Sequence, residues 1–302
     1  MLPGMAGEVR FAIVGAGNFG SALAVSLRRA GYTIDAVIAH SRGASFRTAQ
    51  TLAKEVGARA SVGRPAMLDV DVVWFCVPDG EIARAAEKLD QAFGRVSTKK
   101  ASQLAWKGRV ALHSSGALTS DELAALRKRG ASVASVHPMM TFVRRSRPSL
   151  AGVSFAIEGD AAAVRMARQV VKDLGGEAYA IRKKDKAVYH AWGTFASPLF
   201  TALLATTEQV AAAAGVNRKA ARRRMIPILQ QTLANYASFG APGAFSGPIV
   251  RGDVDTVKRH LRVLKTAPVA RNVYLSLALA ALRYLPTKNR AAIEKVLRST
   301  RR

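Results

Sequence analysis

Three glycines, spaced as G-x-G-x-x-G, directly follow a short apolar run near the start of the chain. The run from Phe11 to Val14 is typical of a buried parallel strand, and the residues from Ser21 to Leu27 are typical of a helix. In this context the glycine turn predicts a dinucleotide site, because backbone can approach a pyrophosphate and the helix N-terminus offers free N–H groups. The alternative is a glycine-rich turn that binds nothing. The predicted contact residues are Gly15, Ala16, Gly17, Asn18, Phe19 and Gly20.

The end of the second predicted strand, Ile34 to Ala39, bears on which dinucleotide binds. In proteins that bind NAD, a carboxylate at this place holds the ribose 2′-hydroxyl. This chain has no acid there, and its residues are His40, Ser41 and Arg42. A guanidinium forms charge-assisted hydrogen bonds with phosphate. We therefore predict that Ser41 and Arg42 bind the 2′-phosphate of NADP, which we favour over NAD, with a plain surface arginine at position 42 as the alternative.

A second strong apolar run extends from Val70 to Pro78. In a doubly wound sheet this strand lies beside the first one, so its end flanks the cofactor. We therefore add Val77, Pro78 and Asp79 to the predicted cofactor-binding residues.

Strand and helix patterns alternate up to about residue 181, and from Lys183 onward the pattern is helical only. The predicted fold class is α/β: an N-terminal NAD(P)-binding Rossmann-like domain with a doubly wound parallel sheet, followed by an all-α C-terminal domain. We place the first domain at residues 1–182 and the helical substrate and dimerisation domain at 183–302, with the boundary anywhere from 150 to 185.

The charge of the chain is +26, from 46 basic and 20 acidic residues. Such a field attracts anionic ligands. The basic residues are scattered along predicted helices with few aromatic residues among them, so we do not predict nucleic acid as a partner. No apolar run reaches the length of about 20 residues that spans a bilayer, and no signal-peptide pattern precedes the first strand. The single cysteine, Cys76, fits a reducing compartment. These features predict a cytoplasmic protein without a membrane partner.

Two histidines, His113 and His137, stand at the ends of predicted strands, where ligands of doubly wound sheets bind. A histidine can donate or accept a proton near neutral pH, as reduction of a carbonyl or oxidation of an alcohol requires. Ser114 and Ser115 follow the first histidine and offer hydroxyls for a substrate oxygen. The alternative for each histidine is a structural one, in which the ring bonds to backbone at the strand end.

A further pair, Lys186 and His190, lies four residues apart on one face of the first predicted helix of the helical domain. A lysine there could polarise a carbonyl or protonate a developing alkoxide. The alternative is a helix start with exposed charges. A loop between later helices adds Ser246 and Arg251, and this arginine either binds an anionic substrate or is solvated.

Several segments together carry a family resemblance. They are Gly15 to Gly20, His113 to Leu118, His137 to Phe142, Tyr189 to Ala191, Ser246 to Pro248, and Arg251 to Asp253. With these segments the chain resembles Rossmann-like proteins that carry a helical C-terminal domain of unknown function. Those proteins belong to the broad class of 6-phosphogluconate, 3-hydroxyisobutyrate and prephenate dehydrogenases and pyrroline-5-carboxylate reductase.

The resemblance implies an NADP-type cofactor, a cytoplasmic location and a homodimer formed through the helical domains. Lys186 matches the catalytic lysine of the hydroxyacid dehydrogenases, although His190 stands where those enzymes have asparagine. His137 matches the catalytic histidine of prephenate dehydrogenases, although Thr141 and Phe142 stand where those enzymes have glycine.

We therefore predict an NADP-dependent oxidoreductase that acts on a small, anionic carbonyl, hydroxy or imino compound, without a metal site. The alternative is a non-catalytic NADP-binding redox sensor or scaffold. The predicted catalytic residues are Lys186, His190, His137, Ser114 and Ser115, and the predicted substrate-binding residues are His113, Ser246 and Arg251.

Overall fold

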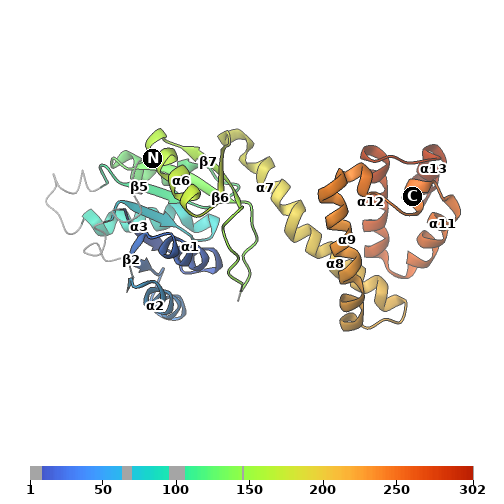
Figure 1. Cartoon of the computed structure of the whole chain (residues 1–302), viewed down its shortest axis with the longest axis horizontal. Coiled ribbons are helices and arrows are strands. Elements are labelled where there is room, and N and C mark those ends of the chain that lie inside the picture. Colours follow the sequence, from blue (N-terminus) through green and yellow to red (C-terminus); the bar gives the residue numbers. More distant parts are fainter. Residues whose placement is uncertain (1–8, 63–69, 95–105, 145, 302) are drawn as a thin grey trace. The chain divides into compact units, whose positions relative to one another are not determined.

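The computed structural model describes residues 9–62, 70–94, 106–144 and 146–301 of the chain. Contacts divide the chain into two compact units, with the division after Thr194. We call the first the sheet unit and the second the helical unit (Figure 1). A sheet flanked by helices precedes a region of helices alone, which confirms the predicted fold class.

The sheet unit contains eight strands in the order β3-β2-β1-β4-β5-β6-β7-β8. Every neighbouring pair is parallel except β6 and β7, which are antiparallel. A parallel neighbour requires a long crossover, usually a helix, and the described residues between β6 and β7 form none. The strands are β1 (Arg10–Val14), β2 (Thr33–Ile38), β3 (Arg59–Ser61), β4 (Val72–Phe75), β5 (Val110–His113), β6 (Ser132–Pro138), β7 (Ser154–Gly159) and β8 (Glu177–Ala180).

Alternate side chains of the central strands enter two hydrophobic cores, one on each face of the sheet. In β1, Phe11 and Ile13 belong to one core, and Ala12 and Val14 belong to the other. The first core is closed by α1 (Asn18–Arg29), α2 (Ala44–Val56) and α6 (Ala161–Asp173), and the second by α3 (Ile82–Gly94) and α5 (Ala124–Lys128). Burial on both faces explains why the central strands are continuously apolar.

The order of the strands reverses direction between β1 and β4, because β2 and β3 extend to one side of β1 and β5 and β6 to the other. Such a switch point opens a crevice beyond the carboxyl ends of the strands, where ligands of doubly wound sheets bind. The glycine turn follows β1 directly, so the fold places it at this crevice.

The helical unit has one compact core, formed by side chains of α11 (Val254–Val263), α12 (Pro268–Tyr284) and α13 (Arg290–Arg301). It also contains α8 (Phe200–Ala213), α9 (Arg218–Ala244) and the short α10 (Pro248–Arg251). Asp253 caps α11 by accepting a hydrogen bond from the Thr256 N–H at 3.0 Å. Among the described residues, no helix is both long and apolar enough to cross a membrane.

The first helix after the sheet, α7 (Lys186–Thr194), packs with the sheet unit, whereas its sequence pattern groups it with the later helices. A π-helical turn, Phe195–Leu199, follows it at the division between the units and contains Pro198. Proline lacks the N–H that an α-helix needs, so the helical hydrogen bonding changes at this place. Because α7 belongs to the sheet unit, its side chains can be placed relative to the strand ends.

Candidate active site

At two of the three glycine positions in the turn between β1 and α1, any residue with a Cβ atom would clash with its neighbours. Gly15 has a φ of +100°, and a Cβ built on it would lie 2.5 Å from the Cys76 carbonyl oxygen. A Cβ on Gly20 would lie 2.1 Å from the Gly15 carbonyl oxygen. A Cβ on Gly17 would meet nothing within 4 Å. Gly15 and Gly20 are therefore required by packing, while Gly17 leaves open space in front of the turn.

The N-terminus of α1 lacks the groups that usually satisfy the first N–H groups of a helix. Gly17 is its N-cap, no side chain caps it, and its first turn contains no acidic residue. The pocket in front of it measures about 730 Å³. Free N–H groups, open space and the helix dipole suit a phosphate group, so these residues fit a dinucleotide. The lining residues are Gly15, Ala16, Gly17, Asn18, Ser21, Ala39, His40, Ser45, Thr48, Cys76, Val77, Pro78, Val143, Arg144, Ser146 and Arg147.

Six of the eleven predicted cofactor residues line this pocket, and five do not, among them Asp79, which accepts a hydrogen bond from the Ser115 hydroxyl. Phe19 and Gly20 belong to α1 and do not line the pocket. The Phe19 ring packs against the Phe142 ring, and Gly20 lies close to the Gly15 carbonyl oxygen. Ser41 and Arg42 are exposed and do not line it either, whereas their neighbour His40 does. The role of Arg42 toward a 2′-phosphate therefore stays a prediction.

The turn after β5 is held by hydrogen bonds to Ser115, which is buried. Its hydroxyl donates to Asp79 Oδ2 at 2.8 Å and accepts from the Leu118 N–H at 2.9 Å. Its carbonyl oxygen accepts from Lys186 Nζ at 3.0 Å and from Ser135 Oγ at 3.1 Å. Ser115 and Asp79 thus fix the turn in this structure, and their polar groups are engaged by protein.

Lys186 lies at the start of α7 and is fully buried. Besides the Ser115 carbonyl, its Nζ donates to Ser135 Oγ at 2.6 Å. Burial lowers its pKa to about 8, against the opposing attraction of Glu158 and Asp79. The ammonium group therefore joins α7 to the ends of β5 and β6 and does not face a cleft.

His113 is fully buried at the end of β5, and backbone groups occupy both of its ring nitrogens. Nε2 donates to the Thr119 carbonyl oxygen at 2.9 Å, and Nδ1 accepts from the Ser115 N–H at 3.1 Å. Burial lowers its pKa to about 4, so the ring is neutral at pH 7. This geometry is the structural alternative for His113, and it leaves no nitrogen for a substrate.

His137 and His190 converge on Gly116. A Cβ built on Gly116 would lie 2.8 Å from His137 Nε2 and 2.7 Å from His190 Cδ2, and the two ring centroids are 6.0 Å apart. His137 comes from the end of β6 and His190 from α7. The absence of a side chain at position 116 is therefore what allows both rings to approach the turn after β5.

Tyr189 lies against His137, with 2.8 Å between its Oη and His137 Nδ1. Burial raises the pKa of Tyr189, so its hydroxyl keeps its proton and can donate it to Nδ1. Burial also lowers the pKa of His137 to about 4, with further contributions from Lys186 and His190. A neutral His137 that accepts at Nδ1 carries its own proton on Nε2, on the side of Gly116.

The remaining predicted site residues, Ser114, Ser246 and Arg251, differ in whether they can contact a substrate. The Ser114 oxygen accepts a hydrogen bond from Trp74 Nε1 at 2.8 Å, which leaves its hydroxyl proton free to donate. Ser246 and Arg251 are exposed residues of the helical unit, so their contribution to a substrate site stays a prediction. Among the described residues, no group of three or more histidine, cysteine or acidic side chains could hold a metal ion.

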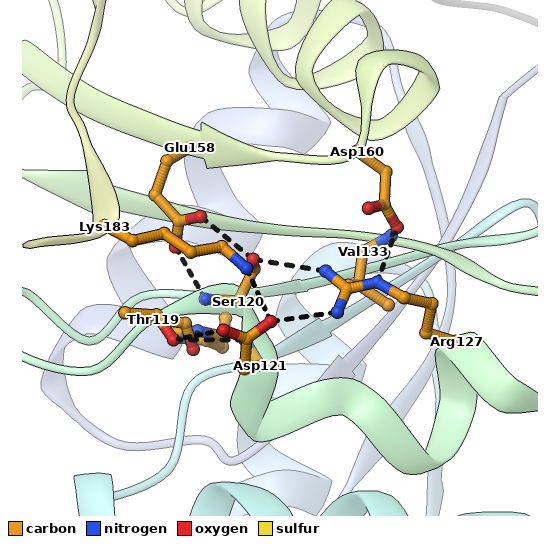
Figure 2. A network of polar contacts seen from close by, with 9 residues as sticks. Thr119, Ser120, Asp121, Arg127, Val133, Glu158, Asp160 and Lys183 are labelled. Atoms are coloured by element: carbon orange, nitrogen blue, oxygen red, sulfur yellow. Dashed lines mark hydrogen bonds and ion pairs between the residues drawn. The ribbon is translucent and has the colours of Figure 1, made fainter.

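A polar network ties the segment before α7 to the strands (Figure 2). Asp121 Oδ1 accepts from Lys183 Nζ at 2.5 Å and from Arg127 Nη1 at 2.9 Å. Arg127 Nε also donates to Asp160 Oδ2 at 3.0 Å. The buried Glu158 accepts from the backbone N–H and the hydroxyl of Ser120. Lys183 stands three residues before Lys186, so this network helps to set the position of α7 and of His190.

The charge of Asp121 should contribute to acid stability. Hydrogen bonds from Lys183 and Arg127 lower its pKa from 3.8 to about 2, so the folded state holds the ionised form more firmly than the unfolded state does. Its stabilising effect is complete above pH 3.8 and is lost as the pH falls through about 2. Because the side chain is half exposed, we expect Asp121→Asn to cost only about 0.5 kcal/mol at pH 6.

This difference in the free energy of unfolding should shrink toward zero between pH 4 and pH 2, within the range set by the two pKa values. Urea unfolding followed by tryptophan fluorescence measures it, since Trp74, Trp106 and Trp192 all lie in the sheet unit. Glu122→Gln is the control, because no described residue forms an ion pair with Glu122. A difference for Asp121→Asn that stays constant down to pH 2 would contradict the ion-pair explanation.

Sequence reasoning did not single out Gly116, Tyr189 as a site residue, or Arg144 and Arg147. Gly116 and Tyr189 stand inside the segments that carried the family resemblance, so their neighbours were a usable signal. The two arginines stand in a basic run after β6 that gives no local sign of facing the glycine turn.

Comparisons with known proteins agree with this architecture. Residues 5–138 match the family model of the Rossmann-like domain, and residues 153–281 match that of DUF2520, a domain of unknown function. No curated protein matches the chain.

Solved structures with the same fold include three that align with almost the whole chain. A candidate NADP oxidoreductase from Bacteroides fragilis has a TM-score of 0.71 at 17% identity, over 91% of this chain and 98% of that one. A protein from Thermotoga maritima has a TM-score of 0.66 at 20% identity, over 97% of this chain and 100% of that one. An imine reductase from Myxococcus stipitatus in complex with NADP+ has a TM-score of 0.61 at 18% identity, over 91% and 94%.

At these identities the likeness to solved structures concerns the fold. The two family matches follow one another along the chain, at residues 5–138 and 153–281, and confirm the resemblance that the sequence motifs indicated. The chain therefore joins a segment that matches the Rossmann-like domain to a segment that matches the DUF2520 domain.

Proposed function

We propose that the chain binds NADP at the glycine turn and transfers hydride between the nicotinamide and a small, anionic carbonyl, hydroxy or imino compound. The observation that carries this proposal is that a candidate phosphate site and a pair of histidines both lie at the carboxyl ends of the parallel strands. The uncapped N-terminus of α1 opens into the pocket, and the His137–His190 pair lies at the ends of β5 and β6. Similar folds in solved structures include an imine reductase in complex with NADP+.

The bound cofactor would supply or accept the hydride. The protein would control the substrate oxygen or nitrogen, where charge changes during the reaction. His137 Nε2–H, oriented by the Tyr189 hydroxyl, would donate a hydrogen bond to that atom, and the free proton of the Ser114 hydroxyl would provide a second one. A neutral imidazole suits this role because it donates a hydrogen bond without adding a charge.

His190 is the best placed group to exchange the proton. Its ring is exposed, lies beside His137 and has no hydrogen-bond partner among the described residues. Lys186 and Ser115, which were predicted as catalytic residues, are buried and bonded to each other, so we assign them a positioning role. Hydrogen bonds from Lys186 hold the turn that carries Ser114 and Gly116 against α7.

Titration of the protein with NADPH and with NADH, followed by nucleotide fluorescence, tests the cofactor. Tight binding of NADPH with weaker binding of NADH is the expected result. Preference for NADH would overturn the choice of NADP, and failure to bind either would overturn the oxidoreductase. Binding without turnover across a screen of carbonyl and imino compounds would favour the alternative, an NADP-binding redox sensor or scaffold. That alternative gains weight from the burial of Lys186.

The proposal includes a homodimer formed through the helical unit. Helix α8 has no buried residue, and α9 has only one, Ala221. Both helices nevertheless carry large apolar side chains that are exposed in a single chain. Surfaces of this kind are usually covered by a partner. A monomeric mass in light scattering would contradict the dimer, and the cytoplasmic location stays a prediction. The exposed side chains on α8 and α9 are Val210, Ile226, Ile228, Leu233, Tyr236 and Phe239.

A further inference from the structure

The segment that follows β6 crosses in front of the glycine turn. We call its described parts, Thr141–Arg144 and Ser146–Leu150, the β6 segment. Its first anchor is Phe142, whose carbonyl oxygen accepts a hydrogen bond from Asn18 Nδ2 at 3.2 Å. The Phe142 ring also packs edge-on against the Phe19 ring, with 5.0 Å between centroids. Both partners belong to the first turn of α1, so this anchor lies at the predicted phosphate site.

A second anchor joins the β6 segment to α2. Arg147 Nη1 donates to Glu55 Oε1 at 2.5 Å. Arg147 also lines a neighbouring hollow of about 370 Å³ together with Arg47 and Thr48 of α2. The β6 segment therefore spans from the start of α1 to α2, and these helices follow the first two strands of the nucleotide-binding half of the sheet.

Arg144 lies between the two anchors and lines the pocket in front of the glycine turn. It is exposed, and no described residue accepts a hydrogen bond from it or forms an ion pair with it. The described residues that line the pocket include two guanidinium groups, of Arg144 and Arg147, and no carboxylate. Glu55 already balances Arg147, so among the described residues that line this pocket Arg144 is the arginine without an ion-pair partner.

We propose that Arg144, which lies outside the usual β1–α1 and β2–α2 turns, binds a phosphate group of the dinucleotide. This inference rests on the proposed function. It follows from the pocket lining, since a guanidinium without a protein partner beside free helix N–H groups is complementary to a phosphate. Arg42, the residue that the sequence favoured for this role, is exposed and does not line the pocket.

The test compares the affinities of wild type, Arg144→Ala, Arg42→Ala and Arg168→Ala for NADPH and for NADH. Arg168 is an exposed arginine of α6 that lines neither pocket, so it controls for the loss of one positive charge from the whole protein. We expect Arg144→Ala to weaken NADPH binding by about tenfold or more, because a hydrogen bond to a charged group is lost. Arg168→Ala should change the affinity for either dinucleotide by less than about twofold, in line with screening of a remote charge.

The two dinucleotides distinguish the phosphate that Arg144 contacts. A loss confined to NADPH identifies the 2′-phosphate, and an equal loss for NADPH and NADH identifies the diphosphate; either result supports the proposal. Unchanged affinities in Arg144→Ala, with wild type binding normally, would overturn it. Failure of the wild type to bind either dinucleotide would instead overturn the proposed function, so the two failures are distinguishable. Arg144→Lys should retain part of the affinity, since it keeps the charge but not the planar fork.

Discussion

Replacing His137 with alanine is expected to lower kcat by about 100- to 1000-fold, the effect of removing one preorganised donor to a developing negative charge. The expected change in Kd for NADPH is less than about threefold, because His137 does not line the dinucleotide pocket. The measurement is steady-state turnover of NADPH with the best substrate from a carbonyl and imine screen, together with a direct titration of NADPH.

The helical unit offers a matched control for this substitution. His260 and Tyr274 repeat the same pairing, with 3.2 Å between Nδ1 and Oη and 5.8 Å between ring centroids. His260→Ala should therefore cost comparable local stability without the loss of kcat. If the two alanine variants lower kcat equally, His137 acts through general stability and has no special place in the reaction.

The pKa values of the site predict how this activity responds to acid. His137 is neutral above pH 4, where burial holds its pKa, so it imposes no loss of activity between pH 5 and pH 8. Below about pH 4, His137 gains a second proton, so the ring becomes charged and Nδ1 can only donate to the Tyr189 hydroxyl oxygen. Any change of activity with pH near neutrality must therefore come from the titration of another group of the site.

A prediction from the sequence succeeded where the residues that determine the feature stand close together along the chain. The apolar runs and the glycine spacing specify β1, the turn and α1 within about 20 residues, so these elements were predictable. The burial of Lys186 was not, because its partners Ser115 and Ser135 stand 71 and 51 positions away. A four-residue spacing shows that Lys186 and His190 share a helix face, but it does not show how deep each side chain lies.

The same limit applies at the pocket. Arg42 has the expected residue type at the expected place after the second strand, and Arg144 is separated from Asn18 by more than a hundred residues. Only the fold of the segment after β6, with its Asn18–Phe142 hydrogen bond, brings Arg144 to the glycine turn. Contacts across that distance along the chain leave no periodic pattern in a single sequence.

The other large effect is expected from Gly20→Ala, which should lower the free energy of unfolding of the sheet unit by about 3 kcal/mol. The added Cβ would lie 2.1 Å from the Gly15 carbonyl oxygen and 3.0 Å from Cys76 Cβ. The nearest atom is backbone, so relief requires α1 to move away from β1. Because the turn between them would be displaced, NADPH binding should be lost as well. Urea unfolding followed by tryptophan fluorescence measures the first effect, and NADPH titration measures the second.

Gly17→Ala separates binding from folding at the same turn. Its Cβ would meet nothing within 4 Å, and its φ of −69° is one that alanine adopts freely. The free energy of unfolding should therefore stay within about 1 kcal/mol of wild type, and reduced entropy of the unfolded chain favours a slight increase. The methyl group would nevertheless occupy the space through which a diphosphate approaches the backbone, so NADPH affinity should fall. Unchanged NADPH affinity in a stable Gly17→Ala protein would show that the open space in front of α1 is not where the diphosphate lies.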